Sequence, residues 1–511
     1  MTEPNATSHI SRRLFLTGGS VAVLAACSRT DALVGPRSDA VAAAETRRRR
    51  AAGIVDVALT AGIATIDLGG RKITTWAYDG RLPGKQIRVT AGQTLRARVT
   101  NQLPIDSSVH WHGLAIRNDM DGVPDLTTAP IKPHATATYE FVVPDPGTYW
   151  FHPHSGTQLD RGLYAPLIVD DPAELGAYAA EWVVVLDDWT DGGIGPDPDK
   201  ILAQLKAGGS AGMSGGMSGM GGMDMGGNGS GGMGSMGAMS SGLLGGDAGD
   251  VDYPLYLVNG RPPNDPDVLV AKPGQRIRIR VINAAADTAF RFALDRHRMS
   301  VTHTDGFPVD PVQVDQILIG MGERFDVAVT LGDGVFQFMA SAEGKGGGSD
   351  ARALVRTGAG AVPPAGHYPS GMTGKLLDVS TLVAATGSAL TEKPPDREHV
   401  LVLAGDMSTY RWTINGKTYD QTDPLPVSQG ERVRLRFQNQ SMMWHPIHVH
   451  GHTLQVRNAS GTGPRKDTIA VLPMKEVAAD LDATNPGQWM VHCHNVYHME
   501  AGMMTRLSYV A

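Results

Sequence analysis

Cysteine is scarce in this chain of 511 residues, which has only Cys27 and Cys493. If Cys27 belongs to a leader, the mature chain cannot form an internal disulfide, and Cys493 is available as a metal ligand or reactive thiol. Charge is also modest: 19% of the residues are charged, the formal net charge is -7, and no long basic stripe lies in the body. We therefore expect small molecules or metal ions as partners, and no nucleic acid.

The N-terminus lacks an apolar run long enough to span a bilayer comfortably. A short run over residues 14–26 follows Arg12-Arg13, which resembles a twin-arginine export signal and predicts a periplasmic or cell-envelope location. Cys27 ends a sequence that resembles a lipobox, in which this cysteine is lipidated and attaches the protein to a membrane. Cleavage after small residues without lipidation is the alternative. Residues 1–27 are thus predicted to be a signal and residues 28–51 a tether.

A strand pattern occurs three times in the chain. The 63 glycines and 32 prolines separate runs rich in Val, Ile and Thr, a composition that predicts a mainly β protein. A glycine followed by an alternating strand and an asparagine recurs at residues 92–101, 274–283 and 430–439. Roughly sixty residues after each glycine, a second glycine precedes an aromatic strand. These repeats predict an all-β fold of three β-sandwich domains in tandem.

The repeats also predict where the domains begin and end. Because the chain is too long for a single core, we assign residues 52–172, 178–360 and 372–511 to three separate domains. The segment 205–247, rich in Gly, Ser and Met, is interpreted as an insert at the start of the second domain.

Four His-x-His pairs stand at matched positions of the first and third repeats. Two histidines at positions i and i+2 of a strand point to the same face, so four such pairs from two domains can converge on one cleft. One pair alone would be interpreted as surface or core histidines, but eight imidazoles facing one another need metal ions. The pairs are His110 and His112, His152 and His154, His448 and His450, and His492 and His494.

The second repeat lacks these histidines. Phe292, Leu294, Met339 and Ser341 occupy the corresponding positions, so we expect this domain to carry no metal.

Cys493 lies between two of the histidines, and its side chain should therefore point to the opposite face of the strand. One thiolate, two imidazoles and a weak thioether are the ligands of blue-copper sites. His445, His498 and Met503 are available to complete this set. Pro153 takes the position of the cysteine in the first repeat, so only the third domain can build the site.

Four segments of the chain resemble those of the multicopper oxidases, the family of laccases, ferroxidases and bacterial copper-efflux oxidases. The resemblance covers essentially the whole mature chain. The segments are His110-Trp111-His112-Gly113, His152-Pro153-His154, His445-Pro446-Ile447-His448-Val449-His450, and His492-Cys493-His494 continued by His498 and Met503.

The resemblance implies three cupredoxin-like, Greek-key domains, in a protein expected to be a monomer, that hold one type 1, one type 2 and two type 3 copper ions. Electrons from a substrate would enter at type 1 and cross through Cys493 to the other three ions, where O2 is reduced to water. The implied ligands are His445, Cys493, His498 and Met503 for type 1, His110 and His448 for type 2, and His112, His152, His154, His450, His492 and His494 for type 3.

Two acidic residues could deliver the protons that this reaction consumes. Asp121, nine residues after His112, matches the position of the acid that serves this purpose in relatives, although an aspartate here could equally cap a loop. Glu500 is the second choice, since copper-efflux oxidases have their acid one position earlier, at Met499 in this chain.

Eight methionines stand among glycine and serine between residues 212 and 242. Thioethers bind Cu(I) well, whereas glycine and serine alone would suffice for a flexible linker, the alternative interpretation. The segment resembles the methionine-rich insert of copper-efflux oxidases and makes Cu(I) the expected substrate, with Met443 as a further contact. The eight are Met213, Met217, Met220, Met223, Met225, Met233, Met236 and Met239.

Two features depart from the copper-efflux oxidases. Their insert lies in the third domain, and they have an aspartate where Ser441 stands, four residues before His445. A laccase-like oxidase of phenols, or a ferroxidase acting on Fe(II), is therefore the enzymatic alternative to a cuprous oxidase. The non-enzymatic alternative is a copper-buffering protein.

Overall fold

Strands make up most of the regular structure in the computed structural model, which describes residues 32–174, 176–208, 239–346 and 350–511. Residues 33–511 form one unit. The helices are α1 (Asp39–Thr46), α2 (Pro198–Lys206), α3 (Val496–Glu500) and the 3-10 turns Asn118–Met120, Leu159–Arg161, Pro172–Glu174, Ser370–Thr373, Val379–Thr381 and Tyr419–Gln421. None of the helices in these ranges is long and apolar enough to cross a membrane.

The first domain is a sandwich of two four-stranded sheets, with strand orders β2-β1-β4-β6 and β3-β8-β7-β5. Its strands are β1 (Ile54–Leu68), β2 (Arg71–Tyr78), β3 (Ile87–Thr90), β4 (Thr94–Asn101), β5 (His110–His112), β6 (Thr136–Val142), β7 (Gly147–His152) and β8 (Ala165–Asp170). Alternate residues of β4 are buried, as the period-2 pattern predicts, and the domain has its own apolar core around Trp111 and Phe151.

The second domain pairs a six-stranded sheet, β12-β9-β14-β19-β16-β17, with a five-stranded sheet, β13-β21-β20-β15-β18. Its strands are β9 (Ala180–Trp189), β12 (Leu255–Val258), β13 (Asp267–Val270), β14 (Arg276–Asn283), β15 (Phe290–Leu294), β16 (Met299–Thr304), β17 (Phe307–Val314), β18 (Ile317–Ile319), β19 (Arg324–Thr330), β20 (Val335–Ala342) and β21 (Ala351–Arg356). A short hairpin, β10 (Ser240–Ser241) and β11 (Gly246–Asp247), precedes β12.

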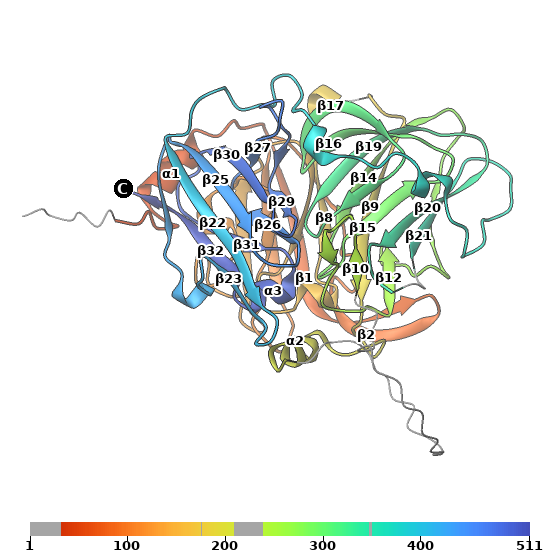
Figure 1. Cartoon of the computed structure of the whole chain (residues 1–511), viewed down its shortest axis with the longest axis horizontal. Helices are drawn as coiled ribbons and strands as arrows, with labels where there is room; N and C mark the ends of the chain where they lie inside the picture. Colours follow the sequence, from red (N-terminus) through yellow and green to blue (C-terminus); the bar gives the residue numbers. More distant parts are fainter. Residues whose placement is uncertain (1–31, 175, 209–238, 347–349) are drawn as a thin grey trace, which may run out of the picture. The chain divides into compact units, whose positions relative to one another are not determined.

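The third domain has the same arrangement, with sheets β23-β22-β25-β30-β27-β28 and β24-β32-β31-β26-β29. Its strands lie beside those of the second domain (Figure 1), and one apolar core runs through both domains. The strands are β22 (Arg397–Asp406), β23 (Arg411–Ile414), β24 (Leu425–Ser428), β25 (Arg432–Asn439), β26 (His445–Val449), β27 (Leu454–Val456), β28 (Arg465–Lys466), β29 (Thr468–Val471), β30 (Glu476–Asp482), β31 (Gln488–Cys493) and β32 (Met504–Val510).

The three predicted repeats occupy equivalent places in the three sandwiches. β4, β14 and β25 are the third strand of the first sheet in each strand order, and β7, β20 and β31 are the third strand of the second sheet. The all-β fold of three tandem cupredoxin-like domains, predicted from these repeats and from the family resemblance, is confirmed.

The segment predicted to be a tether is structured from residue 33 onward. Leu33 forms a β-bridge with Val510, and Arg48 donates a hydrogen bond to Asn485 Oδ1 at 2.9 Å. Between them lies α1, whose Val41 is buried. The tether prediction is therefore wrong for this part. Eight residues are too few for a helix that is stable alone, so α1 depends on packing that the local sequence does not reveal.

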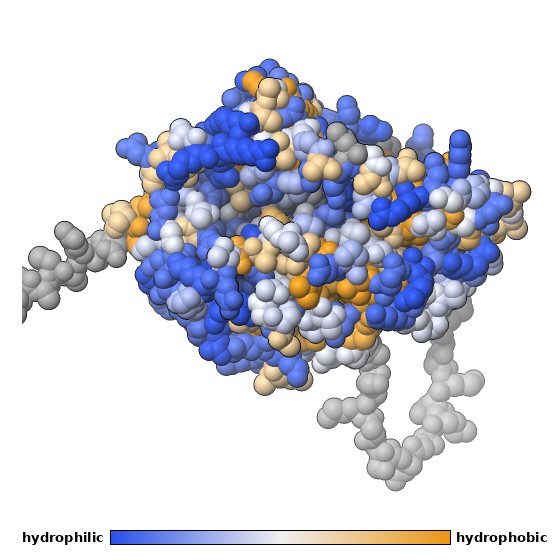
Figure 2. Space-filling model, turned by 90° about the horizontal axis from the view of Figure 1, so that it is seen from above, coloured by the Kyte–Doolittle hydropathy of each residue, from blue (hydrophilic) through white to orange (hydrophobic). Residues whose placement is uncertain are grey.

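Hydrophilic side chains predominate on the face shown in Figure 2, where apolar ones gather mainly in one area. Three methionines are among the large apolar side chains that the described residues expose. Met442 is 71% exposed, Met474 65% and Met407 49%. Single apolar side chains are common at protein surfaces, but a thioether at the surface is also available as a soft metal ligand.

Candidate metal centre

The four predicted histidine pairs meet between the first and third domains. Antiparallel pairing of β5 with β7 sets His110 opposite His152, and pairing of β26 with β31 sets His448 opposite His492. The two domains face each other so closely that the Nε2 atoms of His110 and His448 are 3.4 Å apart. All eight histidines are buried, with at most 7% of any one exposed.

The imidazoles fall into groups in which the nitrogen atoms lie within 4.8 Å of one another. Each group takes histidines from both domains, so neither domain forms one alone. The groups are His112, His152 and His494; His154, His450 and His492; and His110, His112 and His448. The six histidines that the resemblance assigns to type 3 thus divide into two sets of three.

The chemistry of these groups fits a metal such as copper. Burial lowers the pKa of His112, His152 and His494 well below the usual value, so that these rings are neutral and their lone pairs are free to bind a metal. Several buried nitrogens have no hydrogen-bond partner: Nδ1 of His112, Nε2 of His152 and both ring nitrogens of His494. Because a buried polar atom without a partner is costly, a ligand is expected at these atoms.

Backbone carbonyls fix the orientation of the other rings. The Nδ1 atoms of His110 and His448 lie 2.9 Å from the carbonyl oxygens of Asp121 and Asp467, respectively. His492 Nδ1 makes the same kind of contact, at 2.8 Å, with the carbonyl of Cys493. An imidazole held by one nitrogen in this way presents the other nitrogen to a metal.

The second domain supports this centre although it contributes no histidine to it. The Arg324 guanidinium donates to both carboxylate oxygens of Asp467, at 2.6 and 2.5 Å, and Asp467 Oδ1 lies 3.2 Å from His112 Nε2. Arg324 holds the pKa of Asp467 well below its usual range despite complete burial. Gly322 also adjoins the centre, since a Cβ there would lie 2.8 Å from the His494 ring. The sequence repeats did not reveal these residues.

Three of the four corresponding positions of the second repeat carry core side chains, and the fourth, Ser341, is half-buried. Phe292 and Leu294 are fully buried, and the Phe292 ring stacks on Phe338 in the apolar core. Met339 is buried in a small cluster with Met372.

A second group lies on the other face of β31. Cys493 Sγ is 3.7 Å from His445 Nδ1 and 3.6 Å from His498 Nδ1, and these two nitrogens are 3.1 Å apart. Met503 is fully buried, and its carbonyl accepts a hydrogen bond from the Cys493 amide at 3.1 Å. These four residues are the predicted type 1 ligands.

The far side of each imidazole in this group has a polar partner. Ser441 Oγ lies 2.8 Å from His445 Nε2, and Asp250 Oδ2 lies 2.9 Å from His498 Nε2. Tyr410 donates to the same Asp250 oxygen at 2.6 Å. Asp250 was missed at the sequence level because it lies in the second domain, far from the ligands in sequence.

Of the two acids considered for proton delivery, Asp121 contacts the histidines. Its Oδ2 is 3.0 Å from His450 Nδ1, and its Oδ1 is 3.2 Å from His110 Nδ1. Glu500 lies at the end of α3, where burial raises the pKa of its carboxyl and Lys206 opposes this effect. Within the described ranges, no hydrogen bond joins Glu500 to any of the predicted copper ligands.

Of the methionine-rich segment, the residues from Met213 to Met236 lie outside the described residues. Met239 lies within them, and its carbonyl accepts a hydrogen bond from Ala248. Asp247 forms a parallel β-bridge with Met443, two residues from His445, so the chain rejoins the body beside the group around Cys493.

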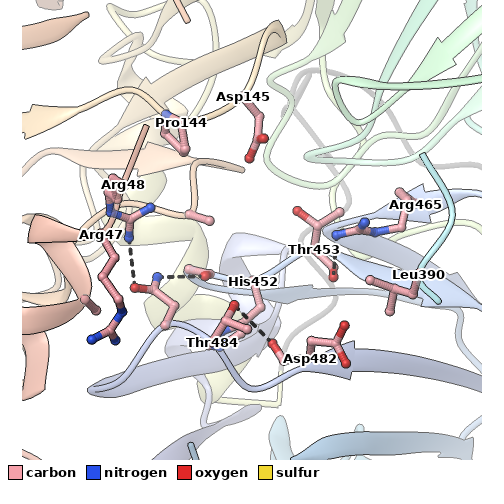
Figure 3. Close-up of a pocket in the computed structure, with 14 residues that line it drawn as sticks. Arg47, Arg48, Pro144, Asp145, Leu390, His452, Thr453, Arg465, Asp482 and Thr484 are labelled. Atoms are coloured by element: carbon pink, nitrogen blue, oxygen red, sulfur yellow. Dashed lines mark hydrogen bonds between the residues drawn. The ribbon is translucent and has the colours of Figure 1, made fainter. Parts of the chain in front are cut away.

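One cavity reaches the main centre, the histidine groups between the first and third domains, at His154. It has a volume of about 480 Å³, and His154, Trp76 and Arg161 are among the residues that line it. Another, of about 420 Å³, lies between α1 and the third domain and is lined by Arg48, Arg465 and His452, among others (Figure 3). None of the twelve predicted copper ligands lines this second cavity.

Known proteins share both the sequence and the fold. Models of the multicopper oxidase family match residues 61–174, 236–361 and 392–510. The chain is 48% identical to multicopper oxidase MmcO of Mycobacterium tuberculosis, over 98% of this chain and 97% of that protein. It is 29% identical to a copper resistance protein A homolog of Pseudomonas syringae pv. tomato, over 96% and 98%. The chain therefore belongs to the multicopper oxidase family.

A solved structure agrees with this assignment at the level of the fold. The multicopper oxidase Fet3p, described as functioning in iron import, superposes with a TM-score of 0.73 at 20% identity, over 89% of this chain and 90% of that one.

The copper-free protein should lose stability steeply in acid. Burial lowers the pKa of eight histidines, so unfolding takes up protons once the pH falls below about 6.5. Each adds up to about 1.4 kcal/mol of lost stability per pH unit. His498 acts in the opposite direction, because Asp250 raises its pKa to about 10 against the effect of burial. The eight are His112, His152, His154, His445, His448, His450, His492 and His494.

Urea unfolding of the copper-free protein between pH 8 and pH 5 measures this effect. A stability that does not change over this range would show that the imidazoles are not desolvated in the folded state.

Proposed function

We propose that the protein is a cuprous oxidase, which oxidises four Cu(I) ions to Cu(II) and reduces one O2, with four protons, to two waters. One observation carries the choice of substrate. The chain leaving the methionine-rich segment pairs with Met443 through Asp247 and then places the Asp250 carboxylate on His498. Met443, whose thioether is a soft ligand, and the chain that follows the methionine-rich segment thus lie at the same edge of the group around Cys493.

The ligand groups support four copper ions. His445, Cys493, His498 and Met503 would hold a type 1 ion. His110 and His448 would hold a type 2 ion, and the two sets of three histidines would hold the type 3 pair. Copper bound there supplies the one-electron chemistry that couples substrate oxidation to the reduction of O2.

The protein connects the two sites through very few bonds. Cys493 belongs to the group with His445 and His498, called the first site because substrate electrons would enter there. Its sequence neighbours His492 and His494 belong to the main centre, the histidine groups between the first and third domains. An electron entering at His498 can therefore cross the strand through the Cys493 side chain and backbone. The cavity lined by His154 gives small molecules a path to the main centre, and Asp121 is placed to hold a proton beside His450 and His110.

The exposed methionines next to the first site support Cu(I) over phenols or Fe(II). Met442 adjoins Met443, and a Cβ on Gly246 of the β10–β11 hairpin would lie 3.5 Å from the Met442 carbonyl. Gly245 approaches Pro473, the neighbour of exposed Met474, in the same way. Thioethers at the surface can hold Cu(I) while it gives up its electron, whereas they have no comparable affinity for Fe(II) or phenols.

The relatives support a role in copper detoxification, and a copper buffer is disfavoured because storage needs no thiolate linked to a histidine centre. We also propose export by the twin-arginine route to the periplasm or cell envelope, with lipidation at Cys27. Residues 1–27 lie outside the described residues.

Replacing the thiolate tests the first site. Cys493→Ser should abolish the intense blue absorption of the copper-loaded protein and all turnover, because serine cannot provide a thiolate. Absorption spectra and copper analysis of both proteins check this result, and the variant should keep the copper held by the histidines. A wild-type protein without a blue band would disprove the ligand assignment.

Shortening the methionine-rich segment tests the substrate. Deleting residues 212–236 removes seven of its eight methionines and keeps the β10–β11 hairpin intact. We expect kcat/KM for Cu(I) to fall about tenfold, a loss of roughly 1.4 kcal/mol of transition-state stabilisation, with little change for a substituted phenol or Fe(II). Oxygen consumption with the three substrates at equal concentration measures these values.

Two variants make this test specific. Replacing the seven methionines by serine at constant length separates loss of thioethers from loss of the segment, and Met442→Ser with Met474→Ser tests the exposed pair. Equal loss for all three substrates would argue for a structural role of the segment. Stoichiometric copper binding without oxygen uptake would favour the copper buffer.

Asp121→Asn tests proton delivery. The amide keeps the shape of the side chain but cannot carry a proton to the centre, so we expect oxygen reduction to slow about 10- to 100-fold. Reduction of the first site by substrate without oxygen, followed at the blue band, should keep its rate. Glu500→Gln is the matched variant on α3, and a larger effect there than at Asp121 would reverse the assignment.

A further inference from the structure

A buried ion pair in the second domain has no part in the proposed mechanism. Asp287 and Lys345 are both fully buried, with Lys345 Nζ 2.5 Å from Asp287 Oδ2. Removing two charges from water is costly, and such a pair is often no more stable than an apolar replacement. The reason for the presence of Asp287 therefore lies in its other contacts.

The Asp287 carboxylate joins two segments that adjoin the first site. Oδ1 accepts a hydrogen bond from Asn495 Nδ2, in the third domain, at 2.5 Å. Oδ2 accepts hydrogen bonds from the amides of Asp250 and Val251 at 3.0 and 2.9 Å. Both segments lead to the same histidine.

The first connection reaches the backbone of His498. Asn495 is the N-cap of α3, and its Oδ1 accepts hydrogen bonds from the amides of Tyr497 and His498 at 3.0 and 3.2 Å. A helix of five residues cannot be stable alone, so the position of His498 depends on this cap and on what orients it. Asp287 orients the cap by holding its amide group.

The second connection reaches the ring of His498. Asp287 fixes the backbone at Asp250, and Asp250 Oδ2 lies 2.9 Å from His498 Nε2. The ring nitrogen that faces Cys493 is the opposite one, Nδ1. One carboxylate thus controls the backbone of His498 through Asn495 and the tilt of its ring through Asp250.

We propose that Asp287 is a positioning residue that sets the geometry of His498 as a copper ligand, and that Lys345 holds this carboxylate in place. The proposal rests on the type 1 ligand set given above. Only a carboxylate suits the position, because Asp287 accepts from Asn495, Lys345 and two backbone amides. An asparagine would turn an NH2 group toward some of these donors.

Asp287→Asn in the full chain tests the proposal. Loss of an outer hydrogen-bond partner of a metal ligand typically weakens metal binding about 10- to 100-fold, and we expect a loss of this size at the type 1 site alone. Competition with a copper chelator, read at the blue band, gives the affinity. The band and the type 1 electron paramagnetic resonance signal should also shift, while the type 2 signal stays unchanged.

Asp326→Asn is the matched control. Asp326 is likewise buried in the second domain and paired with Arg278 and Arg280, but its remaining side-chain contact is with Thr148 of the first domain. This variant should leave the type 1 affinity and spectrum unchanged. Thermal unfolding of the copper-free proteins shows whether each variant folds.

Asn495→Ser provides a second measurement if Asp287→Asn does not fold. Serine keeps a capping oxygen but lacks the amide that donates to Asp287, so it should reproduce the type 1 defect. Wild-type affinity and spectrum in a folded variant, or equal weakening of the type 2 signal or of the control, would overturn the proposal. These readouts need no turnover, so they are independent of whether Cu(I) is the substrate. A wild-type protein without a blue band would instead refute the type 1 ligand set.

Discussion

The removal of eight imidazoles from water, between two domains that each supply half of them, is the constraint on which the rest of the structure depends. Burial lowers the pKa of seven of these rings, and several ring nitrogens are left without a hydrogen-bond partner. Each such atom would cost about 1 to 3 kcal/mol without a partner, so a bound ligand stabilises the closed arrangement. Metal binding and correct docking of the two domains are consequently one event, because a group of three histidines exists only when both domains contribute.

This constraint gives the second domain its function. It shares an apolar core with the third domain and sends polar side chains to both sites. Arg324 clamps Asp467 behind the main centre, and Asp287 reaches the helix that carries His498. A repeat without ligands is therefore still required, since outer contacts decide the orientation of the ligands that the other repeats supply.

The residues recognisable in the sequence are those whose neighbours are close in sequence or fixed by strand periodicity. The repeats and the i, i+2 spacing predicted the three sandwiches and the residues that converge, including the opposite face for Cys493. Arg324, Asp250 and Asp287 could not be found in this way. Each contacts a residue of another domain, and the period of a strand does not predict such a contact. The same limit explains why α1 was predicted to be part of a tether. Its stability comes from packing against distant residues, which the local sequence does not reveal.

The chain that follows the methionine-rich segment supplies one of the outer contacts of the group around Cys493. At sequence level the segment was distant from the first site, and Ser441 stood where an aspartate was expected. In the structure Ser441 contacts His445, while a carboxylate is supplied to the other histidine, His498, by Asp250. Asp250 follows the segment directly, so the acid and the methionines come from the same part of the chain. The carboxylate beside the His498 ring therefore comes from the second domain and not from the loop that precedes His445.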